Sequence, residues 1–359
     1  MASLRLLLLP FSWLFGIILR IRHFLYDSGL KKSEVSELPS IVVGNVVLGG
    51  TGKTPHVELA LRILMDHGPL ATLSRGYGRD GEGFHEVHRE DHARIAGDEP
   101  LMLKRKFSGV RVFVGADRVA SMEAIRKVAP EVKAVILDDA FQHRKLKASL
   151  NIVLTTWQKP WFKDHLLPAG NLRDLPSRAR SADAVVVTKC PQLPSKEDQN
   201  RWRERLNLRP EQPLFFSGLA YADPRSLQDS TMKVPVGPNT SAFLVTGIAD
   251  PSQLLQHVRT LFGTVEHMVF SDHHVFSATD ETRIASRFAT FVGPEIPGQK
   301  PGTLITTEKD AARLGPALLD GPMEDIPIAV ISVKAEILNE PHLFSALLRS
   351  HVATHKANR

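Results

Sequence analysis

A glycine-rich segment between an apolar run and a helical pattern constrains this chain more than any other feature. Its six residues are Gly49, Gly50, Thr51, Gly52, Lys53 and Thr54. They follow the apolar run 41–43 and precede apolar positions with helical spacing over 57–64. A strand, a glycine-rich turn ending in Gly-Lys-Thr and a helix together form a cradle for phosphate groups. The pattern predicts a nucleoside triphosphate site, in which Lys53 reaches the β- and γ-phosphates and Thr54 offers its hydroxyl to Mg²⁺.

The segment departs from the full phosphate-loop pattern at one position. That pattern has a glycine five residues before Gly52, and this sequence has Val47 there. The alternative is therefore a glycine-rich turn in which Gly-Lys-Thr occurs by chance. The flanking strand and helix are what the binding mechanism requires, and they favour the nucleotide site.

The charge balance indicates an anionic partner and narrows its class. The chain has 45 basic and 39 acidic residues, which suits a nucleotide, a nucleic acid or a membrane surface. We find no motif typical of RNA or DNA binding, so a nucleic-acid partner is not expected. The single cysteine, Cys190, excludes an intramolecular disulfide and a zinc site of the CxxC type.

Residues 6–19 near the N-terminus are almost wholly apolar and are flanked by Arg5 and Arg20. A helix of that length spans roughly 21 Å, which is short of the ~30 Å hydrocarbon core of a bilayer. A signal peptide is disfavoured, because arginines occupy the place of a small-residue cleavage site. We expect residues 1–28 to form a membrane-associating helix on anionic lipid. The alternative is a helix that packs on its own domain.

The region after Pro39 alternates short apolar strands with helices, as in a parallel sheet covered on both faces. A length of 359 residues predicts about two domains. We expect an α/β fold with a P-loop NTPase-like parallel sheet sandwiched by helices, and a second, smaller α/β lobe. The expected division is a P-loop kinase core over 29–220, a linker over 221–240 and a second lobe over 241–350 that closes the active-site cleft.

An apolar strand that ends in two carboxylates is the first candidate metal site. Asp138 and Asp139 follow the run 135–137 directly. P-loop enzymes hold Mg²⁺ with an acid at the carboxyl end of a strand. Adjacent residues point to opposite sides, so we expect only one of the two to contact the metal shell. A strand-terminal turn is the alternative.

Two further segments offer candidate bases. Asp98 is interpreted either as an N-cap, with Pro100 in the first helical turn, or as a general base. The segment 271–274 places His273 and His274 beside an aspartate at the end of an expected strand. A histidine there could orient and tune a base across a cleft. Zinc ligation and a simple loop are the alternatives for this segment.

Two loops combine arginine with glycine, namely 74–79 and 168–174, and both suit an anionic ligand. The segment 188–191 is similar to the guanine-reading pattern, but Pro191 stands where that pattern requires aspartate. GTP specificity is therefore not expected.

The ordered set of motifs resembles the tetraacyldisaccharide 4'-kinase family, kinases of the lipid A pathway in Gram-negative bacteria. The matching segments are 43–45, 49–55, 74–78, 97–100, 115–118, 138–143, 168–170, 172–174, 270 with 272–274, and 307–310. They run in family order over nearly the whole chain. The phosphate loop without a glycine at Val47 is itself similar to the family's form.

The resemblance implies phosphoryl transfer from ATP to the 4'-hydroxyl of the tetraacyldisaccharide 1-phosphate precursor, giving lipid IVA. It implies Asp98 as the catalytic base paired with His273, and Arg118 as a cation facing phosphate charge. The implied MgATP site uses Lys53, Thr54, Asp138 and Asp139. Asp174 is a further candidate for the metal shell, although the family often has glutamate there.

The acceptor's acyl chains place the expected enzyme, a monomer, at the cytoplasmic face of the bacterial inner membrane. Two other classes are weighed against this interpretation. One is a GTPase switch or metal-delivery protein, which would prefer GTP. The other is a membrane-recruited ATPase, which would hydrolyse ATP on binding a protein partner without any lipid acceptor.

Overall fold

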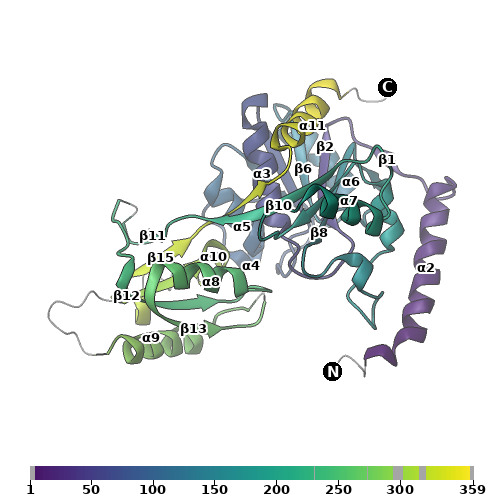
Figure 1. Cartoon of the computed structure of the whole chain (residues 1–359). Helices are drawn as coiled ribbons and strands as arrows, with labels where there is room; N and C mark the ends of the chain where they lie inside the picture. Colours follow the sequence, from purple (N-terminus) through teal and green to yellow (C-terminus); the bar gives the residue numbers. More distant parts are fainter. Residues whose placement is uncertain (1–4, 230, 273, 294–301, 315–320, 356–359) are drawn as a thin grey trace. The chain divides into compact units, whose positions relative to one another are not determined.

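The chain divides into two units, each built around its own β-sheet (Figure 1). The computed structural model describes residues 5–229, 231–272, 274–293, 302–314 and 321–355. The first unit contains the chain up to Asp91, the segment Ile95–Leu219 and the chain from Lys334 onward. The second unit contains His92–Arg94 and Ala220–Val333.

The sheet of the first unit has the order β16-β10-β9-β8-β2-β6-β3-β5-β4. Its strands are β2 (Ser40–Asn45), β3 (Leu70–Ser74), β4 (His85–Glu86), β5 (Arg111–Val114), β6 (Ala134–Asp138), β8 (Leu150–Thr156), β9 (Ala184–Thr188), β10 (Leu214–Tyr221) and β16 (Val333–Ile337). The pairs from β10 to β5 are parallel, and β4 runs antiparallel to β5. The chain passes from β2 to β3 and β5 on one side, and from β6 to β8 and β9 on the other. The carboxyl end of β2 therefore lies at a topological switch point, where open α/β sheets bind ligands.

Helices connect these strands as the βαβ pattern predicts. They are α3 (Lys53–Leu64), α5 (Asp98–Lys106), α6 (Arg118–Val128), α7 (Lys196–Arg205) and α11 (Pro341–Thr354), with the short α4 (Ala93–Ala96) before α5. The unit also contains α2 (Leu9–Asp27) and three 3₁₀ segments, η1 (Met65–His67), η2 (Trp161–Lys163) and η3 (Pro176–Ser181). A small parallel pair joins β1 (Glu34–Val35) to β7 (Leu146–Lys147). The predicted α/β fold class with a P-loop sheet and a second α/β lobe is confirmed.

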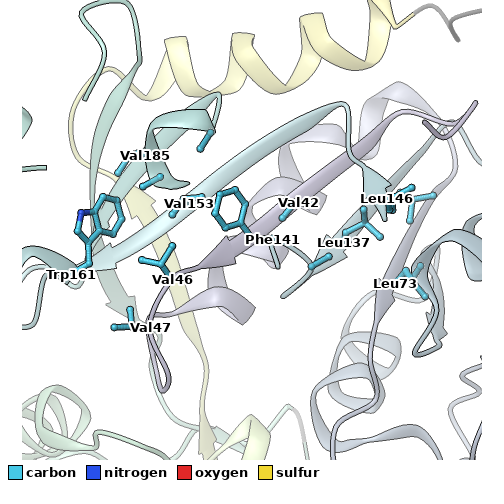
Figure 2. Close-up of a cluster of buried hydrophobic side chains, with 14 of the residues drawn as sticks. Val42, Val46, Val47, Leu73, Leu137, Phe141, Leu146, Val153, Trp161 and Val185 are labelled. Carbon is cyan, nitrogen blue, oxygen red and sulfur yellow. The ribbon is translucent and has the colours of Figure 1, made fainter. Parts of the chain in front are cut away.

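The core of the first unit gathers around Phe141, which lies beside Val42 and Val153 in Figure 2. Many of its members come from the strands of the large sheet and from α6, and Trp161 of η2 lies at one edge of Figure 2. Gly44 makes this packing possible, because a Cβ there would lie 2.7 Å from the Phe141 Cβ. The segment after β6 therefore folds directly over the phosphate-loop strand.

The second unit is a five-stranded sheet with the order β11-β15-β14-β12-β13. Its elements are β11 (Arg225–Ser226), β12 (Gly237–Thr246), α8 (Ser252–Leu261), β13 (Phe262–Val269), α9 (Ala278–Val292), β14 (Thr303–Thr307), α10 (Glu308–Leu314), η5 (Gly321–Met323) and β15 (Ile328–Ile331). Phe243 of β12 packs with Phe288 of α9, and the neighbouring Leu244 packs with Val258 of α8. Alternate residues of a strand point to opposite faces, so α8 and α9 cover opposite faces of this sheet.

The boundary of the second unit differs from the one expected from the sequence. The second lobe was expected to run to residue 350, but the chain returns to the first unit from Lys334. Strand β16 joins the large sheet beside β10, and α11 contacts α3, where Arg349 Nε donates to the Ile63 carbonyl at 3.3 Å. The expected linker also contains β11 and the start of β12.

Helix α2 (Leu9–Asp27) has two contrasting faces. Its buried residues, with helical spacing, are Ser12, Gly16, Leu19 and His23. Ser12 Oγ donates to the Leu166 carbonyl at 2.8 Å, so this face packs on the first unit. The exposed large apolar residues of the helix are Phe11, Trp13, Leu14, Ile17, Ile18, Ile21 and Phe24. Among the described residues, no helix is long and apolar enough to cross a membrane.

Candidate active site

The glycine-rich segment forms a loop between β2 and α3, as predicted. Gly49 and Gly52 adopt φ of 96° and 83°, in the left-handed region that favours glycine. Gly52 is the N-cap of α3, so Lys53 and Thr54 form the first turn of that helix. This geometry places the helix N-terminus beside the loop amides, the arrangement that a phosphate cradle requires.

Val47, where the full pattern has glycine, has a structural role. Its side chain is buried in the core cluster, and its backbone forms an antiparallel bridge with Leu172. Extended backbone at this position needs no glycine. The departure from the full pattern therefore reflects a phosphate loop whose first residues belong to the core.

Polar side chains from neighbouring strands hold the loop. Asn45, the last residue of β2, donates from Nδ2 to Thr51 Oγ1 at 2.6 Å. Thr188, the last residue of β9, donates from Oγ1 to the Thr51 carbonyl at 2.8 Å. Gln142 donates from Nε2 to the Asn45 carbonyl at 2.7 Å. These contacts fix the loop before a ligand binds, which lowers the entropy lost on binding.

Asp139 lies between two cations beside the loop. The Lys53 ammonium is 3.7 Å from Asp139 Oδ2, and the Arg173 guanidinium donates to both carboxylate oxygens. Burial pushes the pKa of Asp139 upward, but the hydrogen bond from Arg173 and the Lys53 charge hold it below its usual value. Asp139 is therefore ionised at neutral pH and pairs with both cations, whose two positive charges exceed its single negative charge.

Asp138, the last residue of β6, has a different environment. Its carboxylate is buried, and Oδ1 has no hydrogen-bond partner among the described residues. Burial and the nearby Glu99 carboxylate raise the pKa of Asp138 to about 7. A buried carboxylate oxygen without a donor fits a cation ligand. Mg²⁺ is usually bound by one or two carboxylates plus phosphates and water, so it needs no cage of protein ligands. Indeed, the described residues contain no group of three acidic, histidine or cysteine side chains placed to hold a metal.

Arg118 is a buried cation near both acids. Its guanidinium donates to the Gly115 carbonyl, and its buried Nε has no partner in the described part of the chain. Burial lowers the pKa of Arg118 to about 10, although the charges of Asp138 and Asp139 oppose that shift. The side chain remains charged at neutral pH and is suited to facing phosphate oxygens.

Asp98 begins α5 in this unit and is half-buried. The expected N-cap role belongs to Gly97 instead, whose φ is 87°. Asp98 Oδ1 accepts the Glu99 N–H at 2.9 Å. Glu99 itself is a site residue that the sequence analysis missed, although it lies in the motif 97–100. Its negative charge raises the pKa of Asp138.

The candidate partner His273 lies outside the described residues. Its neighbour His274 contacts Asp280, with Nε2 and Oδ2 at 3.0 Å, in the capping box that begins α9. On the other side, Asp272 Oδ1 lies 4.0 Å from the Lys309 ammonium. His274 is therefore engaged in holding the start of α9.

Asp174 contacts the N-terminal helix. Its buried Oδ1 lies 2.6 Å from His23 Nε2 and accepts the Leu175 N–H at 2.8 Å. The preceding residue, Arg173, is the one that reaches Asp139. Asp174 Oδ2 is buried and has no hydrogen-bond partner among the described residues, so this oxygen stays available for a metal contact while Oδ1 remains with His23. Arg173 and His23 were not among the expected site residues, although the arginine lies in a loop that the sequence analysis singled out.

Comparisons with known proteins place these features in one family. The family model described as tetraacyldisaccharide-1-P 4'-kinase matches residues 4–352. The chain belongs to the tetraacyldisaccharide-1-P 4'-kinase family. It is 40% identical over 314 residues to the tetraacyldisaccharide 4'-kinase of Bacteroides fragilis strain YCH46, covering 86% of this chain and 82% of that one. It is 37% identical to the enzyme of that name from Flavobacterium johnsoniae, over 98% of each chain.

The fold agrees with this family. The crystal structure of LpxK from Aquifex aeolicus in complex with ATP superposes with a TM-score of 0.71 at 27% sequence identity. The match covers 97% of this chain and 99% of that one. The family resemblance expected from the ordered motifs is therefore confirmed.

Proposed function

We propose that this kinase transfers the γ-phosphoryl group of ATP to the 4'-hydroxyl of an acylated disaccharide 1-phosphate. The observation that carries the proposal is the arrangement of Lys53, Asp139 and Arg173 beside a glycine loop at the switch point of the sheet. Family membership supplies the acceptor, because relatives over most of the chain are tetraacyldisaccharide 4'-kinases.

The phosphate groups of ATP would lie on the loop amides and the N-terminus of α3. The residues proposed to bind them are Gly49, Gly50, Thr51, Gly52, Lys53 and Thr54. Thr54 and Asp138 would hold Mg²⁺, which supplies charge neutralisation to the transferring group, while Asp139 keeps Lys53 and Arg173 in place beside them. Asp174 is a further proposed member of the metal shell through Oδ2, because His23 engages only its Oδ1.

Asp98 is proposed to accept the proton of the acceptor hydroxyl. The hydroxyl oxygen forms the new bond to phosphorus, the bond to the β-phosphate oxygen breaks, and the proton passes to the carboxylate. Arg118 would meet the charge that develops on the phosphoryl oxygens. His273 would orient Asp98 and stabilise its ionised form.

The membrane surface is the proposed place of action. Trp13 and Phe24 of α2 are 68% and 65% exposed, whereas the opposite face of the helix is packed on the first unit. An exposed apolar helix face with arginines beside it is typical of interfacial binding to anionic lipid. We propose that the enzyme, as a monomer, uses this face at the cytoplasmic side of the bacterial inner membrane, where the acylated acceptor resides.

A partition assay tests this function against a nucleotide switch. The protein is incubated with γ-labelled ATP or GTP, with and without the acylated disaccharide, and label is measured in the lipid fraction and in inorganic phosphate. A kinase gives acceptor-dependent label in the lipid fraction, with ATP preferred. Label released only as inorganic phosphate, or a clear preference for GTP, would contradict the proposal.

A further inference from the structure

Arg178, in η3, is a partly buried cation with no ion-pair partner in the described part of the chain. Its Nε atom is buried and has no hydrogen-bond partner. Its guanidinium lies 5.7 Å from the centre of the Phe141 ring, which supports it from one side. Burial and the charge of the nearby Arg144 both lower the pKa of Arg178. An anion that contacts this partly buried guanidinium would therefore stabilise its charged form.

The groups around Arg178 leave a surplus of positive charge. Arg144 lies within 2.6 Å of Asp27 and 3.2 Å of His23, at the end of α2. The charge of Arg22, in the same helix, also lowers the pKa of Arg178. Arg22 donates to the Gln142 carbonyl at 2.7 Å. The three arginines face two carboxylates, Asp27 and Asp174, and the second is already engaged by His23. We call Arg22, Arg144 and Arg178 the arginine cluster.

The arginine cluster lies where the apolar face of α2 meets polar groups. On this helix Ile21 and Phe24 are 56% and 65% exposed, and they flank Arg22 and His23 in the sequence. A molecule whose acyl chains cover this face would carry its polar groups at the level of the cluster. The cluster is also distinct from the phosphate loop. Gln142 separates them, because its carbonyl accepts from Arg22 while its side chain donates to the Asn45 carbonyl.

We propose that the arginine cluster binds the phosphate monoester of an acylated molecule in the bilayer, with Arg178 as the main anchor. A phosphate dianion would supply the missing negative charge, and guanidinium groups bind phosphate through paired, charge-assisted hydrogen bonds. The assignment of that phosphate to the acceptor's own 1-phosphate rests on the proposed function. An anionic lipid headgroup has the same chemistry, and the experiment separates the two sources.

The test uses the full chain and the variants Arg178→Gln and Arg178→Lys. The matched control is Arg201→Gln, because Arg201 is exposed on α7 and pairs with Glu197 of the same helix. In the first arm, KM is measured for the acylated disaccharide with and without its 1-phosphate. In the second arm, co-sedimentation is measured with phosphatidylcholine vesicles that contain or lack phosphatidic acid. Thermal melting of each variant shows that it is folded.

For an acceptor-derived phosphate, Arg178→Gln raises KM for the 1-phosphorylated acceptor about tenfold, the loss expected for a charge-assisted contact. In that case kcat, the KM for ATP and the KM for the acceptor without its phosphate stay as in the wild type. For a headgroup phosphate, Arg178→Gln weakens binding only to vesicles with phosphatidic acid, a result that does not depend on kinase activity. Arg178→Lys keeps the positive charge and should therefore show a smaller loss than Arg178→Gln in either arm. If Arg178→Gln matches Arg201→Gln in both arms, the proposed site is wrong.

Discussion

Arg173 donates to both carboxylate oxygens of Asp139, a residue that also lies 3.7 Å from the Lys53 ammonium. This contact joins the loop after β8 to the acid after β6 and to the first turn of α3. Arg173 also donates to Asn45, which in turn holds Thr51 of the phosphate loop. One guanidinium therefore sets the relative positions of the loop, the lysine and the acid before ATP binds.

The first prediction concerns this guanidinium. Arg173→Gln should lower kcat/KM for ATP about 10- to 100-fold, because a bidentate charge-assisted contact is lost and Asp139 is left with one cation. Arg173→Lys keeps the charge but not the fork, so its loss should be intermediate. Steady-state kinetics with varied ATP measure both. Wild-type kinetics in Arg173→Gln would show that Asp139 needs no such restraint.

The second prediction separates proton transfer from nucleotide binding. Asp98→Asn should lower kcat by ~10²–10⁴-fold, the usual contribution of a positioned base. The affinity for ATP should stay unchanged, because the phosphate loop and Lys53 are intact. Initial rates give kcat, and titration calorimetry gives the ATP dissociation constant. Turnover near the wild-type rate would remove Asp98 from the role of base.

The third prediction uses a buried histidine under the phosphate loop. His56 Nδ1 donates to the Gly52 carbonyl at 2.7 Å, and Nε2 lies 2.8 Å from Ser217 Oγ. Burial lowers the pKa of His56 to about 4. The unfolded chain therefore binds this proton more tightly, because histidine there has its usual pKa of 6.5. The stability contributed by neutral His56 is complete above that value and declines as the pH falls toward about 4.

His56→Gln removes this titration while keeping a side chain that forms hydrogen bonds. The wild type should be the more stable protein at about pH 7.5, and the difference should shrink on acidification by on the order of 1–3 kcal/mol. Urea unfolding of both proteins at several pH values measures the difference, in which contributions of other groups cancel. A constant difference from neutral to acidic pH would contradict a buried, neutral His56.

The fourth prediction contrasts the two faces of α2. Trp13→Glu changes an exposed residue, so it should weaken binding to anionic vesicles without lowering the melting temperature. Gly16→Val should lower the melting temperature, because even a Cβ added at position 16 would lie only 3.0 Å from Leu166 Cδ1. Co-sedimentation and thermal melting are measured on both variants. Equal vesicle binding by Trp13→Glu and the wild type would mean that this face is not the membrane surface.

Much of the active site is predictable because its residues are local in sequence. The pattern of apolar and glycine residues around Lys53 predicts a strand, a loop and a helix. The apolar run before Asp138 and Asp139 predicts a strand that ends at these acids. Parallel strands then bring these carboxyl ends together at one edge of the sheet. This is why Asp138 and Asp139 were expected beside the loop, and the structure places Asp139 near Lys53.

The remaining contacts join residues far apart in the sequence. His23 and Asp174 are 151 positions apart, and no local pattern marks either as the partner of the other. Strand β16 is short, and its residues alternate like those of any half-buried strand. Its sequence therefore does not indicate that it pairs with the sheet of the first unit. The local sequence left Asp98 open between an N-cap and a general base, because aspartate is common at N-caps, but Gly97 takes the N-cap position of α5 with a φ of 87°.

The most direct test of the central claim is the chemical identity of the product. The purified protein is incubated with MgATP and tetraacyldisaccharide 1-phosphate in detergent micelles, and the lipid is analysed by mass spectrometry and phosphorus NMR. We predict the addition of one phosphoryl group at the 4'-hydroxyl, absent with Asp98→Asn on the same timescale. An unmodified acceptor, or a phosphoryl group at another hydroxyl, would contradict the account.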